Sequence, residues 1–199
     1  MRLGNKPVLG PVSLSLYSGE VLGIIGPNGA GKTTLLKVIA GIYKPGAGKR
    51  TLPKREQTVI GYVPQDIALY ESMTARQNLF FWADVYRLPK KAAVKRVEWL
   101  LKELKLEDVA NEAVYKYSGG MKRRLNLGAA LLTTPDVLLL DEPTVGADEE
   151  SARLIEGLIL RAKSLGSSVV FISHHYAEVE RLCSKVIRLE NGRIVPANP

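Results

Sequence analysis

Short aliphatic runs recur along the chain, and segments with helical patterns separate them. Val21–Ile25, Val137–Leu140 and Val169–Ile172 are almost wholly apolar, which is typical of buried strands in a parallel sheet. Val59–Val63 predicts a further short strand. A turn at Asn191-Gly192 predicts a hairpin near the end of the chain. Buried strands that alternate with helices predict an α/β fold with a mainly parallel central sheet.

The segments between these runs predict helices and one further strand. A helix is expected from Lys32 to Ala40, and another between Ser118 and Pro135. A third is expected over residues 151–165, between the last two aliphatic runs. A half-buried strand is also expected near the N-terminus, because apolar residues alternate there with polar ones at Val12, Leu14 and Leu16.

Residues 66–113 contain no aliphatic run of this kind and predict a helical insertion. Thr74 and Gln77 fit a capping box at the start of its first helix. Its second helix has apolar residues on one face, at Val94, Val97, Leu101 and Leu104. We therefore expect one domain, with a core of residues 1–65 and 114–199 and a helical subdomain beside it.

Composition narrows the class of protein. The 199 residues suffice for one domain with a sizeable core. A single cysteine, Cys183, excludes an internal disulfide framework. No apolar run approaches the ~20 residues that span a bilayer. The net charge of +8 is spread along the chain, which favours a solvated basic surface or proximity to a membrane over a nucleic-acid partner.

The strongest motif is a phosphate-binding loop. Gly26-Pro27-Asn28-Gly29-Ala30-Gly31-Lys32-Thr33 follows a buried strand and opens a helix, which is the setting that the motif requires. Its glycines let backbone N–H groups converge on an anion, and the helix N-terminus adds positive charge. Lys32 is expected to reach the phosphates and Thr33 to offer its hydroxyl to Mg²⁺.

Other strands end in polar side chains at the same predicted edge of the sheet. Asp141 fits a magnesium ligand and Glu142 a base that deprotonates an attacking water. Gln65 fits either a magnesium ligand or a group that holds the water. His174 could hydrogen-bond a phosphate, and the residues alone leave His175 as a competitor. Ligands bind at this edge in open α/β sheets.

A second anion site is predicted at Ser118-Gly119-Gly120. Ser118 is a good N-cap, and the glycines leave the N–H groups of the helix N-terminus uncovered. Taken alone, such a segment is most often only a capped helix.

At this point the chain resembles the ATP-binding subunit of an ABC transporter over nearly its whole length. The loop at Gly26 is similar to the Walker A motif and the strand ending at Asp141 to Walker B. Gln65 corresponds to the Q-loop, His174 to the switch histidine, and Asp148 to the D-loop. Tyr117-Ser118-Gly119-Gly120-Met121 resembles the family signature. The acidic helix after His174 favours this histidine over His175.

The resemblance implies a P-loop ATPase with Mg²⁺ and ATP as cofactors. Nucleotide-binding residues would be Gly26, Pro27, Asn28, Gly29, Ala30, Gly31, Lys32, Thr33 and Thr34. Magnesium would be held by Thr33, Gln65 and Asp141. Catalysis would use Lys32, Glu142 and His174. The signature segment, Ser118, Gly119, Gly120 and Met121, would act in trans on the ATP of a second ATPase domain.

The resemblance also implies partners and a location. Two such domains, identical or different, would dimerise head to tail and dock on an integral membrane permease at the cytoplasmic face of the membrane. Tyr117 and Met121 in the signature resemble the branch that exports drugs, antibiotics or polysaccharides. No nucleic-acid partner is expected. The alternatives are a soluble ABC ATPase that acts on nucleic acid or the ribosome, and a P-loop kinase or GTPase.

Two departures from the family pattern concern the N-terminal part. The family has an aromatic residue near the position of Leu3 that stacks on adenine, and this chain has none there. Either adenine is held weakly, or the chain begins late, or Tyr17 or Tyr43 takes the place of this aromatic residue. The stretch between Gly41 and Gln65 is short, so only a small antiparallel β part is expected.

Overall fold

The computed structural model describes residues 1–3, 6–52 and 58–196. A six-stranded sheet has the order β4-β5-β6-β3-β7-β8. The strands are β3 (Val21–Ile25), β4 (Ile60–Val63), β5 (Val137–Asp141), β6 (Ser168–Ile172), β7 (Lys185–Glu190) and β8 (Arg193–Val195). Only β8 runs antiparallel to its neighbour, across the hairpin at Asn191-Gly192. The predicted α/β fold with a mainly parallel sheet is confirmed.

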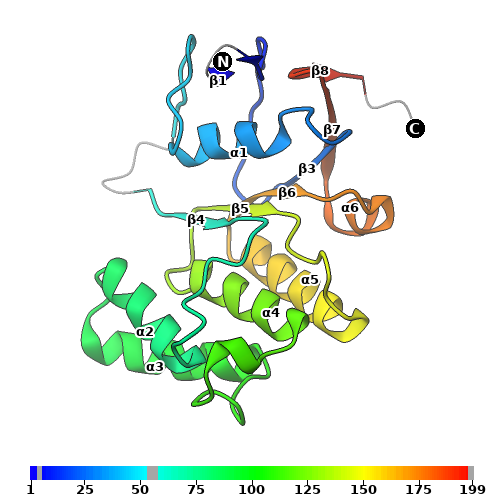
Figure 1. Ribbon diagram of the computed structural model, residues 1–199. Helices are drawn as coiled ribbons and strands as arrows, with labels where there is room; N and C mark the ends of the chain where they lie inside the picture. Colours follow the sequence, from blue (N-terminus) through cyan, green and yellow to red (C-terminus); the bar gives the residue numbers. More distant parts are fainter. Residues whose placement is uncertain (4–5, 53–57, 197–199) are drawn as a thin grey trace.

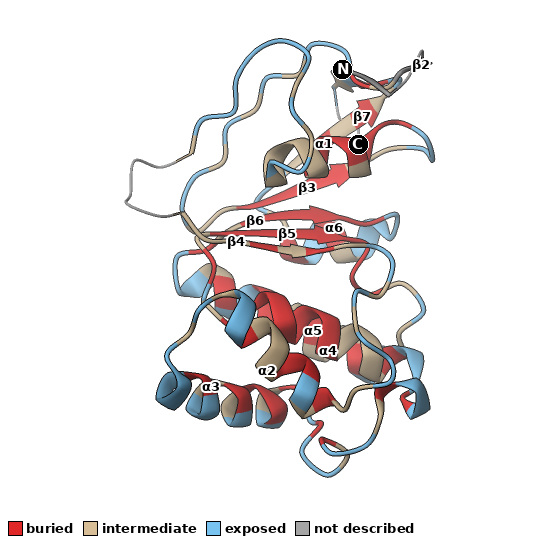
Figure 2. Ribbon diagram, turned by 60° about the vertical axis from the view of Figure 1, so that its left-hand side comes forward, coloured by how far each residue is buried: buried red, intermediate tan, exposed pale blue. Residues whose placement is uncertain are grey.

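Helices cover both faces of this sheet, as Figures 1 and 2 show. One face carries α1 (Lys32–Ala40), and the other carries α4 (Gly119–Ala130), α5 (Glu149–Ser164) and α6 (Tyr176–Leu182). Successive strand residues point to opposite faces. Leu139 therefore packs on the α1 side, whereas Leu138 and Leu140 pack on the side of α4 and α5. Burial on both faces explains why the strands are almost wholly aliphatic.

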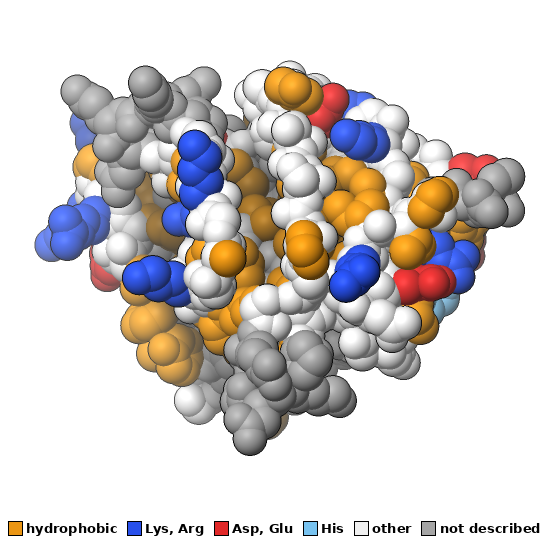
Figure 3. Space-filling model, turned by 90° about the horizontal axis from the view of Figure 1, so that it is seen from above, with side chains coloured by type: hydrophobic (Ala, Val, Ile, Leu, Met, Phe, Trp, Pro, Cys, Tyr) orange, Lys and Arg blue, Asp and Glu red, His pale blue; other side chains and the backbone are white. Residues whose placement is uncertain are grey.

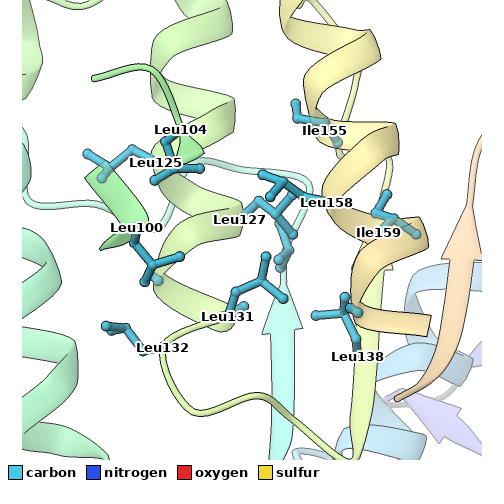
Figure 4. Packing of buried hydrophobic residues seen from close by; sticks show 14 of the residues in the cluster. Leu100, Leu104, Leu125, Leu127, Leu131, Leu132, Leu138, Ile155, Leu158 and Ile159 are labelled. Atoms are coloured by element: carbon cyan, nitrogen blue, oxygen red, sulfur yellow. The ribbon is translucent and has the colours of Figure 1, made fainter. Parts of the chain in front are cut away.

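Two helices of the 66–113 segment, α2 (Ala75–Val85) and α3 (Lys90–Glu103), pack against α4 on the side away from the sheet. The capping box at Thr74 and Gln77 is present. The predicted buried face of α3 was wrong at one residue. Val94 is half exposed, and the buried face is formed by Ala93, Val97, Leu100, Leu101 and Leu104. Figure 4 shows Leu127 of α4 meeting Leu158 of α5, with Leu100 of α3 on the other side of α4.

The N-terminal part differs from the prediction. A short hairpin, β1 (Arg2–Leu3) with β2 (Lys6–Pro7), begins the chain. The strand expected at Val12, Leu14 and Leu16 is not formed. Their side chains are half buried against the α1 side of the core, while the residues between them are exposed. The alternation of apolar and polar residues thus predicted correctly which side chains are buried, but the segment does not pair with a strand.

The reason lies in what flanks this extended segment. A hollow of about 610 Å³ separates it from the loop at residues 45–50, and Leu35 and Val38 of α1 form part of its lining. Figure 3 shows the hydrophobic side chains in the hollows of this face. No described residue range forms a strand beside residues 8–17. Within the described part of the chain, no helix is long and apolar enough to cross a membrane.

Candidate functional site

The phosphate loop connects β3 to α1 through a backbone that requires glycine. Gly26 has φ 145° and Gly31 has φ 99°, and both angles are unfavourable for residues with a side chain. A Cβ atom on Gly26 would also overlap the carbonyl oxygen of Leu189 in β7. The Lys32 ammonium donates to the carbonyl oxygens of Gly26 (2.7 Å) and Pro27 (3.1 Å). The side chain of Lys32 therefore lies along the loop whose N–H groups would bind phosphate.

A cavity of about 580 Å³ brings most of the predicted site residues together. It is lined by Val8, Asn28, Gly29, Ala30, Gly31, Lys32, Thr33, Thr34, Gln65, Asp141, Glu142 and His174. The ends of β4, β5 and β6 thus meet the phosphate loop that follows β3, as expected for the carboxyl edge of a parallel sheet. Of the two histidines, only His174 is among these residues, because His175 forms the N-cap of α6.

Asp141 and Thr33 form the part of the cavity that fits a divalent cation. Asp141 is 1% exposed, and its side chain is hydrogen-bonded to Thr33. Its Oδ2 atom is buried and has no hydrogen-bond partner among the described residues. Burial raises the pKa of Asp141, and the nearby Glu142 carboxylate adds to this, while the Thr33 hydrogen bond opposes it. A buried carboxylate oxygen beside a hydroxyl is a donor set that suits Mg²⁺.

Glu142 has the surroundings of a general base. Its Oε2 atom lies 3.3 Å from Nδ1 of His174 and 3.5 Å from Nε2 of Gln65, at the outer limit of a hydrogen bond. The Glu142 backbone has φ 50°, a left-handed conformation that costs free energy in a residue with a side chain. Such a conformation persists only where neighbouring groups hold it.

One of these holding groups was missed in the sequence. Glu178 of α6 accepts hydrogen bonds from the hydroxyls of Thr144 (2.9 Å) and Ser173 (2.8 Å) through the same oxygen. Thr144 follows Glu142 by two residues, and Ser173 ends β6 next to His174. The acidic pattern of residues 178–180 was the available signal, but its partner at residue 144 lies far away in the sequence.

The signature segment, Ser118–Met121, begins α4 at a different place. Ser118 is the N-cap, and its hydroxyl accepts from the Met121 N–H at 3.2 Å. A Cβ atom on Gly120 would overlap Asp148 Oδ2 and Ser151 Oγ, so this glycine allows α4 to approach the N-terminus of α5. Ser151 also donates to both carboxylate oxygens of Asp148, which lowers the pKa of Asp148.

The cavity has no contribution from the signature segment. Within the described part of the chain, its lining contains none of Ser118–Met121. Ser118 and Gly119 are exposed, which leaves the hydroxyl and the glycine backbone open to solvent. One chain therefore carries two anion-binding features at separate places.

Val8, from the N-terminal part of the chain, also lines the cavity. The side chain of Leu3, near which the adenine position was expected, lies outside the described residues. Neither Tyr17 nor Tyr43 belongs to the described lining. Tyr17 is 67% exposed, and the Tyr43 ring packs under the Lys37 ammonium of α1. Neither of the two tyrosines is therefore at the described cavity, whereas the aliphatic Val8 is.

Comparison with known proteins gives the family of this chain. The ABC transporter family matches residues 9–145. The chain belongs to the ABC transporter family. The match covers the phosphate loop, Gln65, the signature segment and the strand that ends at Asp141, and it confirms the family predicted from these motifs.

Curated relatives include ATP-binding proteins of antibiotic resistance and of Nod factor export. The chain is 38% identical over 200 residues to the linearmycin resistance ATP-binding protein LnrL of Bacillus subtilis, with 96% of this chain and 64% of the relative covered. It is 39% identical to the Nod factor export ATP-binding protein I of Burkholderia lata, with 96% and 66% covered. The chain therefore spans just under two thirds of the length of these relatives.

Solved structures have the same fold. One, described as the ATP-binding subunit of an ABC transporter, has a TM-score of 0.88 and 28% identity, covering 96% of this chain and 83% of that one. Another is a dimeric post-hydrolysis state of the ATP-binding cassette MJ0796 bound to ADP and Pi. It has a TM-score of 0.87 and 27% identity and covers 98% and 93%.

Proposed function

We propose that this chain binds and hydrolyses ATP with Mg²⁺ and powers export through separate membrane subunits. The observation that carries the proposal is the meeting of Asp141, Glu142, Gln65 and His174 with the phosphate loop in one cavity. The family supports ATP as the substrate, and the similarity to a Nod factor export protein supports export.

The proposal gives a role in binding or hydrolysis to the polar side chains of the cavity. The N–H groups at the start of α1 and the Lys32 ammonium bind the β- and γ-phosphates. Glu142 accepts a proton from the attacking water, while Gln65 and His174 orient the water or the γ-phosphate. Thr33, Asp141 and Gln65 would hold Mg²⁺, which neutralises negative charge on the phosphates when bound. Burial of Asp141 keeps water away from that contact.

A second ATPase domain completes the proposed site. Ser118 and Gly119 are exposed and do not line the cavity of their own chain. A helix N-terminus with a hydroxyl donor stabilises an anion, and here that anion would be the γ-phosphate held by the partner domain. A head-to-tail pair satisfies this requirement at both sites, and the dimeric neighbour bound to ADP and Pi supports it.

We place the contact with the membrane subunits on residues 66–113, which we assign to a helical subdomain at the cytoplasmic face of the membrane. Tyr70 is 47% exposed, and its ring meets Phe81 edge to face at 4.7 Å between centroids. Phe81 is partly buried, and an exposed aromatic ring that packs on another favours a protein interface. Copurification of the chain with integral membrane subunits tests this part, and purification without any would contradict it.

Replacement of Glu142 by Gln tests the hydrolytic assignment. The amide keeps the shape of the side chain but accepts no proton. We expect ATP binding to survive and the hydrolysis rate to fall by roughly 10²–10⁴. Equilibrium binding of ATP and steady-state release of phosphate measure the two properties. A variant that hydrolyses ATP as fast as the wild type would remove Glu142 from this role.

A further inference from the structure

Three consecutive cations follow the signature segment in α4, and each bonds to a different part of the molecule. Lys122 pairs with the Glu71 carboxylate at 2.6 Å. Arg124 donates to the carbonyl oxygen of Leu104, after the end of α3, at 2.7 Å. Both contacts bind α4 to the 66–113 segment. Arg123, between them, makes a different kind of contact.

Arg123 joins two loops that leave the sheet at the nucleotide cavity. Its Nε atom donates to the Val145 carbonyl oxygen at 3.0 Å, and its Nη1 atom donates to the carbonyl oxygen of Gln65. A guanidinium is a rigid planar fork, so these two bonds fix the two carbonyls relative to each other. Burial lowers the pKa of Arg123, and the negative charges of Asp66 and Glu142 oppose that effect.

Both loops contact the proposed base. The Gln65 side chain lies 3.5 Å from the Glu142 carboxylate. The N–H of Val145 donates to the Glu142 carbonyl oxygen at 3.3 Å, closing the turn in which Glu142 has its left-handed backbone. Arg123 therefore holds this turn from the side of α4, as Glu178 holds it from the side of α6. If either contact is removed, the left-handed backbone of Glu142 loses part of its support, although this conformation costs free energy.

We propose that Arg123 is a positioning residue that couples the signature segment to Glu142 of its own chain. Arg123 lies little more than one helical turn after Ser118, so both move as one rigid element. A shift of α4 on contact with the ATP of the partner domain would move the carbonyls of Gln65 and Val145, and with them Glu142. The inference rests on the proposed function, because it requires a signature segment that meets nucleotide.

The test compares Arg123→Met with a matched variant, Arg96→Met. Arg96 of α3 also donates to two backbone carbonyls, those of Leu131 (2.6 Å) and Leu132 (3.0 Å), and burial lowers its pKa in the same way. Its acceptors follow the C-terminal end of α4, at the opposite end from the signature segment. Both variants thus lose a half-buried fork of the same kind, but only one loses it beside Glu142.

We expect Arg123→Met to lower kcat about 10- to 100-fold, as a misplaced catalytic group does, with ATP affinity within about two-fold of wild type. Arg96→Met should lower the melting temperature to a similar extent and leave kcat within about two-fold. Arg123→Lys keeps the charge but reaches one carbonyl at a time, so its kcat should lie between those of wild type and Arg123→Met.

Two results would overturn the inference. One is an equal kcat for Arg123→Met and Arg96→Met, which would leave Arg123 a structural role only. The other is full activity of Arg123→Lys, which would reduce its role to charge near Glu142. In both cases an active wild-type chain leaves the proposed function intact, whereas a wild-type chain without hydrolysis would refute that function directly.

Discussion

The nucleotide cavity and the signature segment both present a helix N-terminus to an anion, but their surroundings differ. At the cavity, the N-terminus of α1 faces Asp141, Glu142 and His174 from other strands of the same chain. At the signature segment, Ser118 and Gly119 are exposed, and the nearest packing partners lie behind them, at Gly146 and Asp148. The nucleotide cavity has its proposed catalytic groups in place, whereas the signature segment has only the residues that support its backbone.

In the proposed function, this difference divides the reaction between two chains. The phosphate loop and its carboxylates would bind nucleotide and orient a water. The signature segment would add charge stabilisation where a second nucleotide approaches it. Contacts within its own chain fix the position of the signature segment. Gly120 packs closely against Asp148, and Arg123 donates to carbonyl oxygens of two loops. The comparison therefore predicts that substitutions in the nucleotide cavity and in the signature segment affect different properties of the protein.

The largest contrast is expected for Ser118→Arg. The long cation would block the approach of a partner's nucleotide but leave the cavity of its own chain untouched. We expect ATP binding close to wild type, loss of ATP-induced dimerisation, and a fall in hydrolysis of about 10²-fold or more. Size-exclusion chromatography with ATP and a phosphate-release assay measure these effects. Normal hydrolysis would make the segment a helix cap only.

A smaller effect is expected for Asp141→Asn, at the cavity. Burial raises the pKa of Asp141 above its ordinary value of 3.8, so the folded chain holds the proton more tightly than the unfolded chain. The protonated form therefore contributes stability below about that pH. This contribution is lost as the pH rises through the folded pKa, and at neutral pH the ionised carboxylate destabilises the fold.

Without nucleotide, Asp141→Asn should therefore melt about 2–4 °C above wild type at pH 7, as ~1 kcal/mol does in a chain of this size. The gain should shrink toward pH 4. Added ATP with Mg²⁺ should raise the melting temperature of wild type but not of the variant. Thermal unfolding at several pH values measures both effects. A variant that gains as much from the ligand as wild type does would remove Asp141 from the magnesium site.

The parts of the fold that could be predicted are those set by local pattern. The run Val137–Leu140 implied a strand buried on both faces, and it is one. The spacing from Gly26 to Thr33 implied a loop between strand and helix, which the structure also has. In both cases the residues that determine the structure are neighbours in the sequence, so a single chain contains the information.

The remaining features depend on partners far away in the sequence. The alternation at Val12, Leu14 and Leu16 indicated a buried side, but a strand also needs a neighbour, and none of the described residues supplies it. Arg123 reaches carbonyls 58 and 22 residues away. Every residue has a backbone carbonyl, so the sequence does not indicate which of them accepts a hydrogen bond from Arg123.

The central claim is that a signature segment acts on the nucleotide of a second chain, and mixing two inactive variants tests it directly. In a mixed dimer of Ser118→Arg and Glu142→Gln, one composite site combines an intact cavity with an intact signature segment. If the segment acts in trans, mixing should raise the rate above the sum of the separate variants, because a mixed pair has one intact site and only one site blocked by the arginine. About a quarter of the wild-type rate is the upper limit, reached if half of the dimers are mixed and each has one intact site out of two. No rate above the sum of the separate variants would contradict the claim.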